Sequence, residues 1–183
     1  MKRLIWLGSR GKRMNLLIIG AGGHGKVVAE IATECGYGKI DFLDDNSSDA
    51  IGKISDLGKF VDQYQYAFVS IGNNKFREEL IEILKKCGYQ IPFLIHPTAY
   101  VSRSAKIGKG TVVEPKAIVN ANTKIAEGCI ISVGAIVDHN VVIEKYCHIN
   151  AGVIVNAGAT VEEYTKIEIA EMKSGYQKTG VKK

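Results

Sequence analysis

The sequence predicts a two-part α/β protein, in which a βαβ unit is followed by a parallel β-helix built from six-residue repeats. Two observations carry this prediction. Strand-like and helix-like segments alternate over the first half of the chain, which is typical of a parallel sheet with crossover helices. In the second half, an isoleucine or valine recurs at every sixth residue from Val101 to Ile167, a period that suits neither an isolated helix nor a simple strand.

Residues 14–96 are expected to form the first domain, which amounts to half of a doubly wound sheet. Apolar runs predict its strands, and helical periodicity ended by a glycine predicts its helices. The expected elements are a strand at 15–20, a helix at 25–35, a strand at 39–43, a strand at 66–71, a helix at 74–87 and an extended segment at 91–95.

Residues 97–169 are expected to form the β-helix. The β-branched residue of each repeat points inward, and a small or slender residue two places earlier leaves room for it in a narrow tube. Three repeats close a triangular coil, and successive coils stack at roughly 4.8 Å. Cys129 and Cys147 occupy the same position in successive coils and are therefore predicted to be small core residues, one above the other. The three flat faces favour side-by-side association.

The positive charge is concentrated at the two ends of the chain. The formal net charge is +5, but the segment 1–13 holds five basic side chains and no acid, and the segment 171–183 holds four lysines and one acid. We expect 1–13 to be a basic leader before a natural start at Met14, and 170–183 to be an irregular basic tail. Because the stretch between them is net acidic, no basic face for nucleic acid is predicted.

The sequence shows no signal-peptide core and no segment of transmembrane length. The four cysteines follow no disulfide or metal pattern, which predicts a reduced, cytoplasmic setting. The four histidines are scattered, and no Cys/His pair has the spacing of a structural zinc site. No metal is therefore expected.

The turn after the first strand carries a glycine-rich motif, Gly20-Ala-Gly-Gly-His-Gly25. Glycines at such a turn let backbone amides approach phosphate oxygens at the start of a helix. An acidic pair, Asp44 and Asp45, follows the next strand, where a ribose-binding carboxylate would stand. The pattern alone fits a nicotinamide dinucleotide, a nucleotide-sugar or a tight turn without a ligand. The half-sized domain favours a nucleotide-sugar.

Five motifs in order (GAGGHGKVV, FLDD, SIGNN, IHPTAYVS and an Asp-His pair in the third coil) resemble one family over residues 15–169. It is that of the bacterial nucleotide-sugar N-acetyltransferases of the sialic acid O-acetyltransferase group. The resemblance implies a left-handed β-helix, a homotrimer, acetyl-CoA as co-substrate and a UDP-linked 4-amino sugar as acceptor. It also implies a substrate site in the first domain, made by Gly22, Gly23, His24, Asp44, Asp45 and Gly72.

The Ile and Val residues that recur from Val101 to Ile167 form an inward column along the β-helix. Two histidines, His139 and His148, lie outside this column. A histidine on a surface is often merely solvated, but the resemblance gives both a role. It implies that His139 is the general base that takes a proton from the attacking amine. It implies that His148 contacts acetyl-CoA and that the backbone of Ile169 holds the pantetheine arm.

Two departures from the family pattern bear on activity. Family members usually have an acidic residue directly after the base, but this chain has Asn140 there, and its acidic residue, Asp138, comes directly before His139. We therefore expect His139 to be a functional but weakened base. The repeat stops at Ile169, whereas family members continue for another coil and a G-x-P-A-K-like loop. Four interpretations remain open: the N-acetyltransferase, a sugar O-acetyltransferase, a catalytically impaired nucleotide-sugar-binding trimer, and an NAD(P)-dependent oxidoreductase suggested only by the glycine motif.

Overall fold

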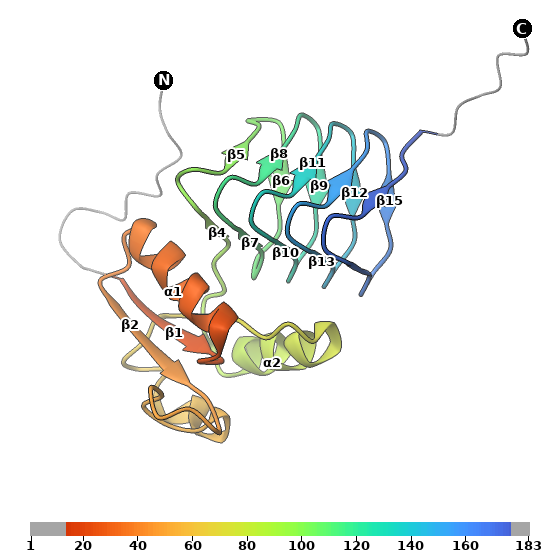
Figure 1. Cartoon of the computed structure of the whole chain (residues 1–183). Coiled ribbons are helices and arrows are strands. Elements are labelled where there is room, and N and C mark those ends of the chain that lie inside the picture. The colour runs from red at the N-terminus through yellow and green to blue at the C-terminus, as the bar shows by residue number, and fades with distance from the viewer. Residues whose placement is uncertain (1–13, 177–183) are drawn as a thin grey trace, which may run out of the picture. The chain divides into compact units, whose positions relative to one another are not determined.

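A computed structural model describes residues 14–176. The expected leader at 1–13 and the end of the expected tail at 177–183 lie outside this range. The chain divides into two compact units between Pro97 and Thr98 (Figure 1), one residue from the boundary that the sequence predicts.

The first unit is built on a three-stranded parallel sheet with the strand order β2-β1-β3. The four residues from Leu16 to Ile19 in the central strand are fully buried, as expected for a strand covered on both faces. The elements are β1 (Asn15–Ile19), α1 (Gly23–Glu34), β2 (Lys39–Leu43), the 3₁₀ helix η1 (Ile54–Lys59), β3 (Tyr66–Val69), α2 (Asn74–Lys86) and β4 (Leu94–Ile95).

Both α-helices form where the sequence predicts them, but α1 begins two residues earlier. Gly22 is its N-cap, so the glycine turn itself becomes the first turn of the helix and carries His24. At α2, the Asn73 side chain accepts a hydrogen bond from the backbone N–H of Phe76 at 3.0 Å, a common N-cap arrangement. The short helix η1 is not predicted, because a single turn has too little periodicity to detect.

The second unit is a parallel β-helix whose strands are only two residues long (Figure 1). They stack in three sheets, with the orders β16-β13-β10-β7, β17-β14-β11-β8-β5 and β15-β12-β9-β6. The strands are β5 (Tyr100–Val101), β6 (Lys106–Ile107), β7 (Val112–Val113), β8 (Ile118–Val119), β9 (Lys124–Ile125), β10 (Ile130–Ile131), β11 (Ile136–Val137), β12 (Val142–Ile143), β13 (His148–Ile149), β14 (Ile154–Val155), β15 (Thr160–Val161), β16 (Lys166–Ile167) and β17 (Met172–Lys173).

The predicted inward column forms the core of the β-helix. Its members from Val113 to Val161 are all buried, and each pairs with the equivalent residue of the neighbouring coil, as Val137 does with Val119 and Val155. Cys129 and Cys147 are buried in this core, as predicted from their spacing.

The small residues two places before each member of the inward column form a second column, and they make hydrogen bonds that the sequence does not reveal. Each of four side chains donates to a carbonyl oxygen at a corner of the next coil, and so ties the two coils together. The bonds are Thr111 Oγ1 to Ala126 (2.9 Å), Thr123 Oγ1 to Asp138 (2.6 Å), Cys129 Sγ to Glu144 (3.1 Å) and Cys147 Sγ to Glu162 (3.0 Å).

A third column of residues turns the corners. Every residue three places after a column member, from Ile107 onward, has a φ between +56° and +70°. This left-handed conformation favours glycine and asparagine, yet it is also taken here by larger residues. The corner residues are Gly110, Lys116, Asn122, Gly128, Gly134, Asn140, Tyr146, Gly152, Gly158, Tyr164 and Ala170.

The stack of strands runs past residue 169, where the loss of the Ile/Val column predicts its end. Ala170 has the corner conformation, and β17 pairs with β14 in the usual register. Backbone bonds to the coil below, such as the one from Ile154 N to Glu171 O at 3.0 Å, hold this strand although Lys173 replaces an apolar inward residue. The β-helix thus extends one strand beyond the predicted boundary.

Between residues 14 and 176, no helix combines the length and the apolar character that crossing a membrane would require.

Candidate functional site

The glycine turn of the first unit is packed tightly at its two ends. Gly20 has a φ of +105°, which a residue with a side chain rarely adopts. A Cβ added to Gly25 would collide with the Gly20 carbonyl. The buried Ser70 hydroxyl donates to the carbonyls of Ile19 and Gly20 at 3.0 and 2.8 Å. Gly20 and Gly25 therefore serve the close approach of strand and helix.

The two middle glycines have a different environment. Gly22 and Gly23 are exposed, and a Cβ added to either would meet nothing within 4 Å. Packing within the chain therefore does not require glycine at these positions. Their bare backbone leads into the first turn of α1, whose N–H groups have no acceptor within the helix. This turn can accept a ligand's phosphate oxygens at close range.

Asp44 supports the glycine turn directly. Its Oδ2 accepts from the backbone N–H of Ala21 at 2.8 Å, and its Oδ1 accepts from Asn46 and Ser47 at 2.8 and 3.1 Å. These hydrogen bonds hold the pKa of Asp44 below its usual range, and the bond from Ala21 has the largest effect. The exposed Asp45 accepts from the backbone N–H of Ile54 at 3.0 Å.

His24 lies half-buried in the first turn of α1. Burial, and secondly the positive charge of Arg77, lower the pKa of this histidine to about 4. The ring is therefore neutral near pH 7. It can offer a ligand a hydrogen-bond donor or acceptor, but no positive charge.

Arg77 lies beside this site, although no sequence motif points to it. It is fully buried in α2, and its Nη1 donates to the carbonyls of Ile71 and Gly72 at 2.9 and 3.3 Å. Its Nη2 donates to Oδ1 of Asn74 at 2.8 Å. Arg77 therefore fixes the turn that carries the exposed Gly72. In the sequence, Arg77 is one of several charged residues in α2. The only feature that sets it apart is its position one turn after Asn74.

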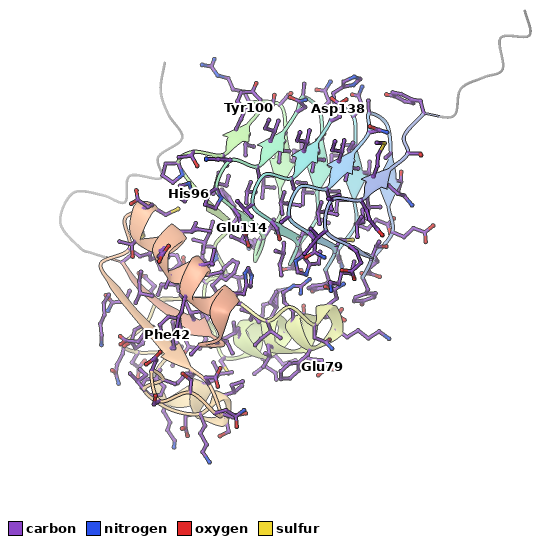
Figure 2. All side chains as sticks on the ribbon, in the orientation of Figure 1. Phe42, Glu79, His96, Tyr100, Glu114 and Asp138 are labelled. Carbon is purple, nitrogen blue, oxygen red and sulfur yellow. The ribbon has the colours of Figure 1, made fainter. Side chains whose placement is uncertain are left out.

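The second unit presents His139 on the corner that follows β11. The side chain is exposed, and its Nδ1 lies 2.9 Å from the amide nitrogen of Asn140. Asp138, labelled in Figure 2, does not bond the ring: its Oδ1 accepts from the backbone N–H of His139 at 2.7 Å and from Asn120 Nδ2 at 3.1 Å. The first of these bonds holds the pKa of Asp138 below its usual range.

Asn140 thus has two roles at this corner. Its φ of +56° turns the chain, a conformation that asparagine tolerates well, and its amide contacts the imidazole. His139 and its two neighbours, Asp138 and Asn140, lie on the same corner. It is the neutral amide, and not the carboxylate, that contacts the ring.

The two residues expected at the acetyl-CoA site lie elsewhere on the β-helix. His148 is half-buried in β13, with Nε2 3.3 Å from the Ser132 hydroxyl. Ile169 is 70% exposed on the corner after β16. Over the described range of 14–176, no three or more His, Cys, Asp or Glu side chains gather in a way that could hold a metal ion.

These features define a class: proteins in which a βαβ unit with an open glycine turn is followed in the chain by a parallel β-helix of six-residue repeats. The model of the PglD N-terminal domain family matches residues 15–84. The acetyltransferase domain of PglB from Neisseria gonorrhoeae is 36% identical, with a TM-score of 0.85, and the match covers 89% of this chain and 83% of that one. The chain belongs to the family of nucleotide-sugar N-acetyltransferases.

Further relatives extend this comparison. The PglB domain is also known in complex with acetyl coenzyme A. A variant of GDP-perosamine N-acetyltransferase from Caulobacter crescentus, in complex with CoA and GDP-perosamine, is 26% identical with a TM-score of 0.78, covering 88% of this chain and 89% of that one.

A curated relative comes from Bacillus subtilis. Its UDP-N-acetylbacillosamine N-acetyltransferase is 33% identical in an alignment 110 residues long, and the match covers 54% of this chain and 50% of that protein. The match thus spans about half the length of this relative. Together these findings confirm the predicted family and fold class.

Proposed function

We propose that the protein is an acetyl-CoA-dependent N-acetyltransferase that acts on a UDP-linked 4-amino sugar. The observation that carries the proposal is the exposed imidazole of His139, whose Nδ1 contacts its neighbour Asn140 on a corner of the β-helix. The N. gonorrhoeae domain in complex with acetyl coenzyme A and the C. crescentus enzyme in complex with GDP-perosamine support it. UDP is favoured over GDP by the B. subtilis relative.

In this reaction His139 acts as general base. The sugar amine attacks the acetyl carbonyl of the thioester, and Nε2 of His139 takes the proton that the amine loses. The new N–C bond forms as the C–S bond breaks, and the released thiolate takes up a proton to leave as the free thiol. No covalent bond to the protein is needed. Asn140 orients the ring but, as a neutral amide, gives the imidazolium cation less support than a carboxylate would.

The first unit is proposed to bind the nucleotide part of the substrate. Gly22 and Gly23 offer exposed backbone for the diphosphate, and the neutral His24 offers a hydrogen bond beside it. Asp44 orders the turn through its bond to Ala21, which leaves the exposed Asp45 as the better partner for ribose or uracil. Gly72 belongs to the same proposed site.

The coenzyme is proposed to contact the β-helix at two residues. The His148 ring on the outer surface of β13 can donate or accept a hydrogen bond, and the corner at Ile169 offers exposed apolar area and backbone to the pantetheine arm. A cytoplasmic location suits this co-substrate, and none of the four cysteines is in a disulfide.

A homotrimer is proposed from an apolar stripe along one face of the β-helix. The outward residues of the sheet β17-β14-β11-β8-β5 are all apolar or aromatic, and no charge interrupts them; they are Tyr100, Ile118, Ile136, Ile154 and Met172. Tyr100 and Met172 are 58% and 65% exposed. Ile154 is 37% exposed, and Ile118 and Ile136 are half-buried. An uninterrupted apolar stripe that is open to solvent in part is typical of an association surface.

The assembly is tested by light scattering on Ile136→Lys, which places a charge at the middle of the stripe. The variant should fall to monomers, while Thr160→Lys, on a different sheet, should remain trimeric. A monomeric unaltered protein would contradict the proposed trimer.

The activity is tested by following thiol release with UDP- and GDP-linked 4-amino sugars. His139→Ala should lose at least about 100-fold in kcat and still bind the nucleotide-sugar in calorimetry. His148→Ala should instead raise the KM for acetyl-CoA. Full activity in His139→Ala would refute the base.

The same measurements decide among the alternatives. Transfer only to a sugar hydroxyl would indicate an O-acetyltransferase. Nucleotide-sugar binding without acetyl-CoA binding would indicate the catalytically impaired trimer, and a thermal shift with NAD(P) would revive the oxidoreductase.

A further inference from the structure

We propose that Tyr176 is a positioning residue for His139: its hydroxyl orients the Asn140 amide so that Nε2 of the imidazole is left as a proton acceptor. The catalytic meaning of this inference rests on the proposed function. The geometric part concerns only three side chains on one corner of the β-helix.

Tyr176 lies against that corner, although 64% of its surface is exposed. Its backbone N–H donates to the carbonyl of Ala157 at 3.1 Å. A Cβ added to Gly158 would collide with the Tyr176 ring, and one added to Gly175 would collide with the carbonyl of Ala157. Gly158 and Gly175, which have no side chains, therefore leave the space in which the Tyr176 segment packs. Asn140 and Gly158 are equivalent corner residues of successive coils, and Tyr176 follows Gly158 by the same interval of 18 residues.

The Asn140 amide links the tyrosine to the histidine. As placed in the structure, Nδ2 of this amide lies 2.9 Å from Nδ1 of His139 and donates to the hydroxyl oxygen of Tyr176 at 3.2 Å. Asp138 does not compete for the ring, because its carboxylate accepts from the His139 backbone and from Asn120. Asn140 is therefore the neighbouring side chain that orients the imidazole.

Two hydrogen-bond patterns fit this geometry, because an amide can turn over and exchange its nitrogen and oxygen. If the nitrogen of Asn140 faces the ring, it donates to Nδ1. The ring proton is then on Nε2, and Nε2 cannot accept the proton of the amine. If the oxygen faces the ring, Nδ1 carries the proton and Nε2 has a lone pair, as a base requires.

The tyrosine hydroxyl favours the second pattern. A phenol is a better donor than acceptor, so the Tyr176 O–H bonds more strongly to the amide oxygen than the amide N–H bonds to the phenol oxygen. The cation formed in catalysis imposes the same choice, because both nitrogens of an imidazolium are donors and Nδ1–H then needs an oxygen. Tyr176 thus holds the amide, before reaction, in the orientation that the protonated ring requires.

The test is the tautomer of His139, read by ¹⁵N NMR of the histidine-labelled protein at a pH where the ring is neutral. The unaltered protein should show Nδ1–H, and Tyr176→Phe should shift the ring toward Nε2–H. Thiol-release assays should show kcat reduced about tenfold with the KM for nucleotide-sugar unchanged. Tyr164→Phe, at another corner and stacked on Tyr146, should leave both readouts unchanged.

A second variant makes the result specific. Adding Asn140→Asp to Tyr176→Phe replaces the amide by a carboxylate that can only accept, and it should restore the Nδ1–H tautomer. The inference is overturned by an Nε2–H ring in the unaltered protein, or by the same tautomer and kcat in Tyr176→Phe. Failure of the proposed function would look different, because the tautomer would respond as expected while no acetyl transfer was detected.

Discussion

The bond from Thr123 to the corner that carries His139 offers a sharp test of how the β-helix supports catalysis. Thr123 is fully buried. Its hydroxyl donates to the carbonyl of Asp138 at 2.6 Å and accepts from the backbone N–H of Val141 at 3.3 Å. Thr123→Val keeps the shape of the side chain and removes both bonds. Each buried polar atom left without a partner costs about 1–3 kcal/mol, so unfolding should require about 2–6 kcal/mol less.

A matched control separates stability from catalysis. The buried Thr111 makes the same pair of bonds one corner away, to the carbonyl of Ala126 at 2.9 Å and from the N–H of Cys129 at 3.1 Å. Thr111→Val should lose a similar free energy of unfolding in urea titrations. Only Thr123→Val should release the backbone beside His139, and a shift of about 1 Å there costs on the order of 100-fold in rate. Equal kcat values in the two folded variants would refute the reasoning.

Two further predictions concern the first unit. Because folding lowers the pKa of His24 from 6.5 to about 4, the unfolded chain binds a proton in this interval that the folded chain does not. The free energy of unfolding should therefore fall as the pH drops from 6.5 to about 4, by at most about 3 kcal/mol, and His24→Gln should flatten this slope in acid titrations. Gly25→Ala, whose Cβ meets the carbonyl of Gly20, should destabilise by about 3 kcal/mol or more, as measured by thermal unfolding. Gly22→Ala should lower the melting temperature only slightly, because alanine is a poorer N-cap than glycine, and should weaken nucleotide-sugar binding in calorimetry. An equal loss of stability in both variants would contradict this division of roles.

Much of the fold could be predicted because its main determinant is a periodic burial of apolar residues. The inward column from Val113 to Val161 and the stacked Cys129 and Cys147 lie as predicted. The corners could not be predicted in the same way. Their requirement is a positive φ, and residues as different as Lys116 and Tyr146 meet it, so composition gives no repeat to detect.

The candidate site shows the same limit. Local motifs indicated the glycine turn and the exposed His139, because each lies within a few residues of its neighbours. The contact from Tyr176 to Asn140 joins positions far apart in the chain and exists only because two whole coils are stacked. Arg77 was missed because a charged residue in an amphipathic helix is ordinarily solvated. Sequence patterns predict which side chains lie on the same helix, strand or turn. They do not predict contacts between residues that are far apart in the sequence and meet only on folding.

The register of the β-helix has a consequence for how such proteins can change in length. Strands of the second unit pair with the equivalent strand of the neighbouring coil, without a shift in register. A tandem duplication of one whole coil would therefore return every side chain to its own column and lift the downstream corners by one step of roughly 4.8 Å. Gain or loss of a single residue would instead exchange inward and outward positions throughout the rest of the stack. Natural or engineered variants of this β-helix should accordingly differ by whole coils.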